Sequence, residues 1–194
     1  VQEHTLGLSV LPHKDVYVST SHDSVWGVAQ NIGTSVNTLK NDEIMSLSPD
    51  GHTLFVYKET NLNGDVFESH LEGENWSIPT KLSSNINSSY QVSSASLSHD
   101  GRSLYFTTNN PINNLGGHDI YVSHWDNKLE TWGVAQNLSN QINTPYDEKG
   151  VFAHPDGKTL YFSSEGHNSM GGLDVFKTTW DKYKKSWEKP VNMG

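Results

Sequence analysis

The sequence has no cysteine, which excludes disulfide bonds, thiolate zinc sites and a cysteine nucleophile. It also has no apolar run near the roughly 18 to 20 residues of a membrane-spanning helix. Basic residues are scarce, with 13 Lys and Arg against 22 Asp and Glu, so the formal charge is -9. A surface of this charge repels phosphate backbones and anionic lipid, and we expect neither nucleic-acid binding nor direct membrane insertion.

Hydrophobic residues make up only 34% of the 194 residues, whereas aromatic residues reach 10%. This balance favours many short, half-exposed strands anchored by large rings over a thick helical core. The length is sufficient for one domain with its own core. We therefore expect a thin, aromatic-rich β core.

Three similar stretches recur along the chain: SPDGHTLF from Ser48, SHDGRSLYF from Ser98 and HPDGKTLYF from His154. Four kinds of landmark keep one period of 50 to 56 residues across these stretches. They are the turn aspartates Asp50, Asp100 and Asp156, the strand-opening aspartates Asp15, Asp65, Asp119 and Asp174, the tryptophans Trp26, Trp76, Trp132 and Trp187, and the asparagines Asn37, Asn87 and Asn143. Chance does not keep four phases aligned, so the chain is built from repeats.

Each repeat contains four runs of strand length. In the third repeat they begin at Val92, Ser103, Asp119 and Thr131, are rich in β-branched or aromatic residues, and are bounded by turn formers. The Asp-Gly pair between the first two runs fits a tight hairpin, because glycine tolerates the positive φ that such turns require. The pattern predicts an all-β chain of four-stranded antiparallel sheets.

A four-stranded unit this small cannot bury both of its faces alone, which is typical of the blades of a β-propeller, where neighbouring blades cover one another. We predict one propeller domain or fragment with about four blades, at 1–38, 39–88, 89–144 and 145–194. The first blade begins at a second strand, near residues 3–10, and lacks an innermost strand. We expect the chain to be part of a larger propeller or a larger protein; the alternative is a strand supplied from elsewhere.

The residues around each landmark resemble the WD40-like propeller repeat that carries an S-P-D-G turn. The Trp-Asp pair of that repeat is present at Trp125 and Trp180, whereas the second repeat has Leu71 and Glu72 there. The motif order GGLDVF, then Trp, then PVN is similar to that of propellers attached to OmpA-like peptidoglycan-binding domains in Bacteroidetes. The repeat also resembles the propeller of the Tol system's periplasmic component.

This resemblance implies a non-catalytic scaffold that binds other envelope proteins in the periplasm or at the outer membrane of a Gram-negative bacterium. It further implies a place in a peptidoglycan-associated or type nine secretion assembly, with contact to glycan or peptidoglycan through other domains. A second hypothesis is a carbohydrate-binding or carbohydrate-active module, a lyase or hydrolase, because propellers also serve these roles. No cofactor is expected in either case.

Two acidic clusters break the repeat. Asp42 and Glu43, and later Asp147 and Glu148, come just before predicted innermost strands. In a propeller they would ring one mouth of the central channel, where they could bind a cation, a cationic partner segment or a polar ligand. The alternative is a set of solvated acids that keep the protein soluble.

The repeated residues have a structural interpretation. Because a residue present in every blade is displaced around a ring, we interpret the repeated aspartates as acceptors for loop amides, with a converging catalytic set as the alternative. We expect the repeated tryptophans to pack between blades; the alternative is a row of exposed rings that stack on sugars. No H-E-x-x-H motif or paired histidine predicts a metal site, and no catalytic residue is assigned. The basic stretch 177–189 predicts a solvated hairpin without a binding role.

Overall fold

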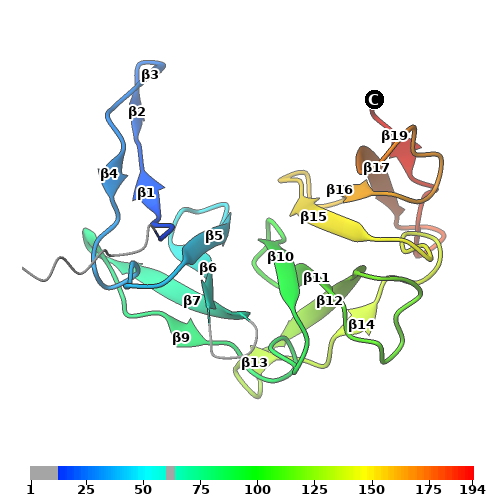
Figure 1. Ribbon diagram of the computed structural model, residues 1–194, viewed down its shortest axis with the longest axis horizontal. Helices are drawn as coiled ribbons and strands as arrows, with labels where there is room; N and C mark the ends of the chain where they lie inside the picture. The colour runs from blue at the N-terminus through cyan, green and yellow to red at the C-terminus, as the bar shows by residue number, and fades with distance from the viewer. Residues whose placement is uncertain (1–12, 60–63) are drawn as a thin grey trace, which may run out of the picture.

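The computed structural model of the chain describes residues 13–59 and 64–194, and every regular element in these ranges is a β-strand. The strands form antiparallel sheets, here numbered blades 1 to 4 in chain order, that follow one another along an open arc (Figure 1). The predicted all-β fold of repeated four-stranded, propeller-like sheets is confirmed. The strand predicted near residues 3–10 lies outside the described residues.

Blades 2, 3 and 4 share one strand order, and blade 1 is described in its last strands. Blade 1 contains β1 (Tyr17–Val18), β2 (Ser21–His22), β3 (Val25–Trp26) and β4 (Gln30–Asn31). Blade 2 contains β5 (Asp42–Leu47), β6 (Thr53–Glu59), β7 (Gly64–Glu72), β8 (Asn75–Trp76) and β9 (Thr80–Lys81). Blade 3 contains β10 (Val92–Leu97), β11 (Ser103–Thr108), β12 (Asp119–Asp126), β13 (Thr131–Trp132) and β14 (Gln136–Asn137). Blade 4 contains β15 (Glu148–Ala153), β16 (Thr159–Ser164), β17 (Asp174–Asp181), β18 (Ser186–Trp187) and β19 (Val191–Asn192).

The fourth strand of each full blade is split into two short pieces that both pair with the third strand. In blade 3, β13 pairs with the end of β12 and β14 pairs with its middle. Between them Gly133 N donates to His124 O at 2.9 Å, and the next residues bulge out of the sheet. The single outermost strand predicted from the sequence is therefore two ladder segments with an exposed bulge between them.

The turns between the first and second strands have one repeated geometry. In blade 2, Asp50 Oδ1 accepts hydrogen bonds from Ser48 Oγ at 2.5 Å and His52 N at 3.0 Å. Gly51 follows with a φ of 75°, and the glycines at this position in blades 3 and 4 both have a φ of 71°. These left-handed values are the ones that favour glycine, so the Asp-Gly pairs form the predicted turns.

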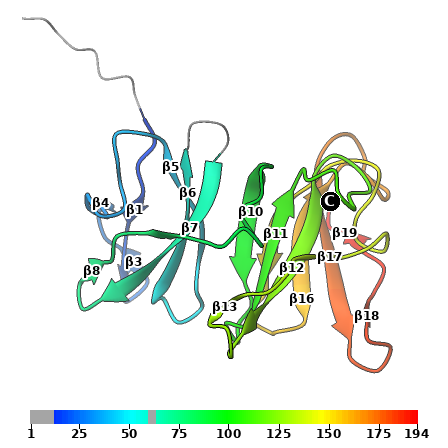
Figure 2. The ribbon, with the colours of Figure 1, turned by 90° about the horizontal axis from the view of Figure 1, so that it is seen from below.

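The core lies between successive sheets. Side chains alternate along each strand, so β11 directs Leu104 and Phe106 toward blade 2 and Tyr105 toward blade 4. Three apolar clusters result, one at each joint between successive blades, and Figure 2 shows the sheets of blades 3 and 4 side by side. Full burial of one large apolar side chain contributes about 1.5–3 kcal/mol, so each blade depends on its neighbour for stability.

The strands that precede the Asp-Gly turns are the innermost ones. β10 lies between β5 and β15. Val151 N of β15 donates to Ser94 Oγ at 3.2 Å, and Ala153 N donates to Ser96 Oγ at 3.0 Å. The short serine side chains of β10 thus let two innermost strands approach closely and hydrogen-bond to each other.

A buried asparagine joins the last loop of each repeat to its third strand. Asn143 Oδ1 accepts from Ile120 N at 2.8 Å, and Asn143 Nδ2 donates to Ile120 O at 2.9 Å. Asn37 and Asn87 make the same two bonds to the corresponding residues of blades 1 and 2. Because a buried N–H needs a partner, this side chain supplies the acceptor that the strand ladder lacks and adds a second bond to the carbonyl, which explains the repeated asparagine.

Candidate functional site

Two of the four acids predicted at the channel mouth are buried inside their own blades. Asp42 accepts hydrogen bonds from Thr38 N at 2.6 Å and Thr38 Oγ1 at 2.8 Å, and its second carboxylate oxygen contacts Lys58 Nζ at 2.8 Å. Glu148 accepts the same two bonds from Thr144, at 2.9 and 2.6 Å. Both carboxylates are buried, which corrects the expectation that they line an open mouth: each closes the loop that enters its innermost strand.

Blade 3 shows what these acids do, because it has Val92 in their place. Beside it Thr108 Oγ1 is buried and has no hydrogen-bond partner among the described residues. Ser164 holds the matching position in blade 4 and donates to Glu148 at 2.7 Å. Burial raises the pKa of Glu148, and the hydrogen bonds from Thr144 and Ser164 oppose that rise. The acid therefore satisfies polar groups that would otherwise be buried alone.

The other two predicted acids connect neighbouring blades. Glu43 accepts a hydrogen bond from Lys14 Nζ of blade 1 at 2.6 Å. Asp147 accepts from the backbone N of His118 in blade 3 at 2.8 Å, and Lys149 Nζ lies 2.7 Å from its other oxygen. Burial alone would raise the pKa of Asp147, but these bonds outweigh it and hold the pKa at about 2. A binding role for this pair stays a prediction.

The strand-opening aspartates contact the ends of their own blades. Asp119 Oδ2 accepts from Leu115 N and Asn137 Nδ2, both at 2.7 Å. Asp174 makes the equivalent contacts in blade 4, and Asp65 is paired with a lysine of β9 at 2.7 Å. In blades 3 and 4 the carboxylate thus holds the loop before the third strand. One such residue lies on each blade, and each is engaged by its own blade.

The repeated tryptophans pack onto the preceding blade wherever that blade is described. Trp132 and Trp187 are buried in the clusters that join blades 2 and 3 and blades 3 and 4. Trp76 is partly buried against the cluster between blades 1 and 2. Trp26 departs from the expectation: it is exposed, because no described sheet covers that face of blade 1.

Histidine and acidic side chains do not gather into a metal site within residues 13–59 and 64–194, where no group of three or more is placed to hold an ion. In the same part of the chain no helix is long and apolar enough to cross a membrane.

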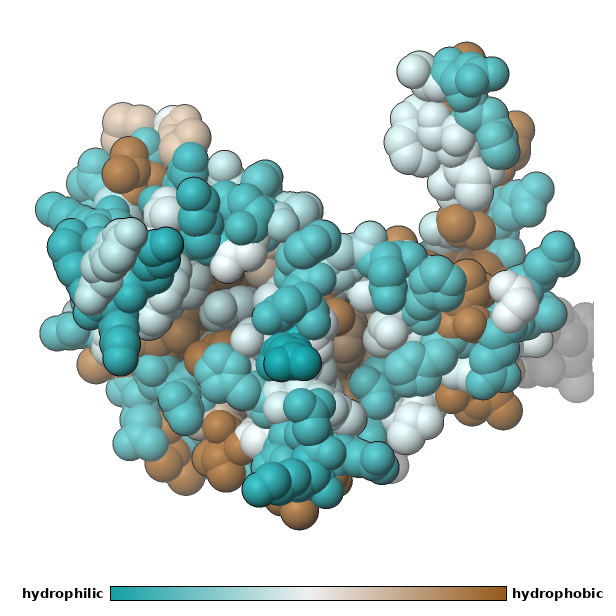
Figure 3. All heavy atoms as spheres, turned by 180° about the vertical axis from the view of Figure 1, so that it is seen from behind, coloured by the Kyte–Doolittle hydropathy of each residue, from teal (hydrophilic) through white to brown (hydrophobic). Residues whose placement is uncertain are grey.

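An exposed aliphatic residue recurs at the outer edge of blades 1 to 3. Val28, Ile78 and Val134 each stand two residues after the repeated tryptophan, in the bulge that splits the fourth strand, and all three are strongly exposed. We call these three residues the aliphatic rim. Seen from behind, the surface is mainly hydrophilic, and its apolar residues lie in separate clusters (Figure 3).

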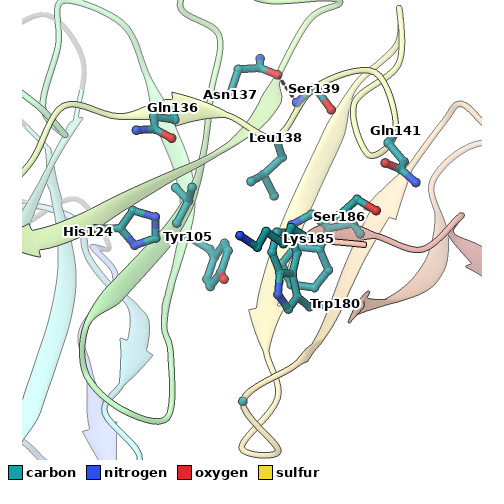
Figure 4. Close-up of a pocket in the computed structure, with 13 residues that line it drawn as sticks. Tyr105, His124, Gln136, Asn137, Leu138, Ser139, Gln141, Trp180, Lys185 and Ser186 are labelled. Carbon is teal, nitrogen blue, oxygen red and sulfur yellow. Dashed lines mark hydrogen bonds between the residues drawn. The ribbon is translucent and has the colours of Figure 1, made fainter. Parts of the chain in front are cut away.

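A cleft of about 490 Å³ opens at the joint between blades 3 and 4 (Figure 4). Blade 3 contributes Tyr105, Gln136 and Gln141 to its lining, and blade 4 contributes Trp180, Lys185 and Trp187. The volume lies within the range of small-ligand sites, roughly 300–1,000 Å³. The lining combines aromatic rings with uncharged amides, the usual composition of such sites.

The matching joint between blades 2 and 3 is bridged by a hydrogen bond. Asn85 and Trp132 occupy the positions that Gln141 and Trp187 hold at the cleft. Asn85 Nδ2 donates to Trp132 O at 2.7 Å, which draws the loop of blade 2 onto blade 3. Gln141 instead lies at the edge of the cleft (Figure 4).

The aromatic residues of the cleft support one another. The rings of Trp180 and Trp187 meet edge to face with centroids 5.4 Å apart, and Tyr105 meets Trp187 in the same way at 6.2 Å. Burial raises the pKa of Tyr105 to about 12, so its hydroxyl stays protonated at neutral pH. These contacts hold Trp180 in place with its ring accessible.

Lys185 extends its side chain into the cleft from the hairpin between β17 and β18, and it is the one lysine or arginine among the lining residues (Figure 4). No carboxylate is among the residues that line it. Lys185 stands where blade 3 has Glu130. Residues 177–189 include the hairpin that the sequence predicts, and its lack of a binding role stays a prediction. The position of Lys185 in the cleft was not predicted, although the reversal of charge at one repeat position was the signal that could have identified it.

Comparisons with known proteins support the fold. No protein-family model matches the chain, and no curated protein matches it. Its structure is similar to TolB from Acinetobacter baumannii, with a TM-score of 0.54, 16% identity, and coverage of 80% of this chain and 33% of that one. A chain of the nidogen–laminin complex aligns with a TM-score of 0.58 and 12% identity over 94% of this chain and 59% of that one. The periplasmic gluconolactonase PpgL of Pseudomonas aeruginosa aligns with a TM-score of 0.50 and 16% identity over 96% of this chain and 53% of that one.

The chain therefore spans between about a third and three fifths of these proteins. Identities this low show a shared β-propeller fold and no more. One of the three is named as an enzyme and another is part of a protein complex, so the fold is compatible with both kinds of role. The described blades belong to a propeller that resembles TolB among others.

Proposed function

We propose that this chain is part of a non-catalytic β-propeller that acts as a scaffold for other proteins in the cell envelope of a Gram-negative bacterium. The observation that carries the proposal is how the carboxylates are used. Asp42 and Glu148 are buried in their own blades, and Asp147 accepts a hydrogen bond from a backbone amide of the preceding blade. General acid and base groups must reach a substrate, and these acids instead hold the blades.

The aliphatic rim supports a role in protein binding. Its three residues are β-branched, exposed, and carried by a bulge of a rigid sheet on three successive blades. Single exposed apolar residues are ordinary, but the same position left apolar three times presents one kind of contact along the outer edge. Burial of such residues against a partner would contribute hydrophobic free energy to binding.

The envelope location is supported by two likenesses. TolB and a periplasmic lactonase have propellers similar to this chain. The repeat also resembles propellers linked to OmpA-like domains. On this resemblance we extend the proposal to a place in a peptidoglycan-associated or type nine secretion assembly. The charge of -9 agrees with partners other than nucleic acid.

Site-specific photo-crosslinking in cells tests the proposal. A photoreactive residue placed at Val28, Ile78 or Val134 should crosslink the protein to the same envelope protein in each case. A photoreactive residue at the exposed turn position His99 is the matched control and should not. Recovery of the protein from the cytoplasm, absence of crosslinks from all three rim positions, or catalytic turnover of a saccharide by the purified protein would each contradict the proposal.

A further inference from the structure

The cleft between blades 3 and 4 is a ligand site of a different kind from the aliphatic rim. It lies at a joint whose counterpart, between blades 2 and 3, is bridged by the bond from Asn85 to Trp132. We propose that this cleft binds a saccharide that carries a carboxylate group. The site would add a sugar-binding activity to the scaffold, and it does not depend on the scaffold role.

Trp180 is the stacking platform. Its side chain remains 39% exposed, whereas the equivalent joint of blade 3 leaves Trp125 packed against the buried cluster there. Trp187 holds Trp180 edge to face, and Tyr105 in turn holds Trp187, so the indole is fixed before a ligand arrives. A pyranose ring has an apolar face of C–H groups that can cover such an indole, and a pre-ordered ring loses little entropy on binding.

Lys185 selects the charge of the ligand. It extends its ammonium group into a lining that contains no carboxylate. The backbone of the turn does not explain the residue, because Lys185 and its counterpart Glu130 have nearly the same φ, 53° and 49°. What changes between the two blades is the sign of the charge. A ligand carboxylate would supply the missing partner and form a charge-assisted hydrogen bond.

The remaining polar groups match hydroxyls. Gln136 and Gln141 line the cleft from blade 3, and Ser139 and Ser186 add hydroxyl groups from either side (Figure 4). An amide or a hydroxyl can both donate and accept, as each sugar hydroxyl does. His124 of blade 3 also lines the cleft. Hydrogen-bonding groups of this kind, gathered around an accessible indole and a lysine, suit a sugar acid.

A peptide is the main rival ligand, and the geometry disfavours it. Proline-rich segments dock into successive aromatic slots, whereas here Trp187 and Tyr105 are largely covered and Trp180 offers one accessible platform. The third strands beside the cleft are paired on both sides, and the fourth strands are split into two-residue pieces that offer little continuous edge for strand addition. The observations therefore favour one stacked ring over an extended chain.

Isothermal titration calorimetry tests the proposal with three acidic probes, trigalacturonate, trimannuronate and sialyllactose, and with galactotriose as the neutral probe. At least one acidic probe should bind with a Kd on the order of 0.1–1 mM, and galactotriose should bind about tenfold more weakly or not at all. Added salt should weaken binding, since the ion pair is partly exposed.

Four variants locate the site and guard against misfolding. Trp180→Ala and Lys185→Glu, the latter restoring the residue of blade 3, should each weaken binding of the acidic probe by about tenfold or more. Lys185→Met tests the charge without reversing it and should weaken binding less than Lys185→Glu. Lys182→Glu is the matched control on the same hairpin and should leave binding within about twofold.

Three results would overturn the proposal. The first is that none of the acidic probes binds below about 5 mM to the folded wild-type protein. The second is equal binding of galactotriose and the acidic probes, or equal loss in the Lys185→Glu and Lys182→Glu variants. The third is Trp180-dependent binding of a proline-rich peptide without any binding of the acidic sugars. Unchanged thermal unfolding of each variant shows that the fold is retained.

Discussion

The blade faces inside the chain and the faces at its two outer ends carry similar residues but differ in what covers them. Trp132 of blade 3 is 4% exposed against blade 2, whereas Trp26, at the same repeat position in blade 1, is 71% exposed. On the other side, Ile120 of blade 3 is fully buried against blade 4, whereas the equivalent Val175 of blade 4 is 44% exposed. Identical positions thus reach opposite burial.

This contrast shows that the repeat encodes a sheet with two apolar faces. Strand alternation places apolar side chains on both faces of every blade, and only the presence of a neighbour decides whether they are buried. The stability of one blade is therefore in large part a property of the joint. The outer faces of blades 1 and 4 are joints without a described partner.

The largest expected effect comes from removing the ring at a covered face. Trp132→Ala should lower the free energy of unfolding by about 3–5 kcal/mol, because it leaves a cavity between blades 2 and 3. Trp26→Ala, the equivalent substitution in blade 1, should change the free energy of unfolding by less than about 1 kcal/mol. Urea unfolding of both variants measures the difference. Equal losses in the two variants would show that the covered and open faces do not differ as described.

A smaller loss is expected from the buried asparagine of the third blade. Asn143→Ala leaves the N–H of Ile120 without a partner, whereas the C=O keeps its bond from Leu138 N, and it should cost about 1–3 kcal/mol of unfolding free energy. The neighbouring Asn140 is exposed, so Asn140→Ala is the matched control and should be nearly neutral. Loss of slow amide exchange at Ile120 in the first variant would place the effect at that bond. An unchanged exchange rate at Ile120 would contradict this assignment.

Much of the fold could be predicted from the sequence because its signals are local and repeated. The turn at Asp50 depends only on the Asp50 side chain, Ser48 and one glycine, and an Asp-Gly turn occurs three times in the chain. Alternation within β11 likewise predicts two buried faces. A motif that occurs three times gives a stronger prediction than a single copy. The repetition of the asparagine likewise indicates a structural position, which its two bonds to Ile120 explain.

The candidate site was less predictable because it depends on how neighbouring blades meet. Burial of Asp42 follows from the loop that Thr38 closes, and the four-residue spacing to the threonine is a weak signal by itself. The cleft arises from the difference between Asn85 and Gln141 and from the placement of Lys185. Such differences are departures from the repeat. A repeat predicts what its copies share, and it does not predict what a single substitution does to one joint.

Acid should loosen the joint between blades 3 and 4 more than the joint between blades 1 and 2. The pKa of Asp147 is lowered from the ordinary 3.8 to about 2, so its contribution is present above about pH 4 and is lost as the pH falls toward 2. Because the ion pair of Asp147 with Lys149 lies near the surface, water screens it. We therefore expect the Asp147 carboxylate to contribute about 1 kcal/mol to the free energy of unfolding. Asp147→Asn should remove this part of the pH dependence.

Glu43→Gln is the control for that experiment, since the pair of Glu43 with Lys14 is exposed. Urea unfolding at several pH values between 2 and 6 measures both variants. The difference between wild type and Asp147→Asn should shrink as the pH falls through this window, while the Glu43→Gln difference stays near zero. A constant difference for Asp147→Asn would show that the carboxylate charge does not hold the joint.

The open faces should also recognise each other between molecules. The trailing face of blade 4 presents the same kind of side chains that pack against a following blade elsewhere, and the leading face of blade 1 presents the exposed Trp26. We therefore expect head-to-tail self-association of the purified chain that grows with concentration, measured by sedimentation velocity. Val175→Asp should weaken it about tenfold, because a carboxylate would be buried at the contact. Val134→Asp alters an exposed aliphatic of the rim instead and should leave association unchanged. If both substitutions act alike, or the chain remains monomeric at about 100 μM, exposed blade faces do not attract one another as the covered ones do.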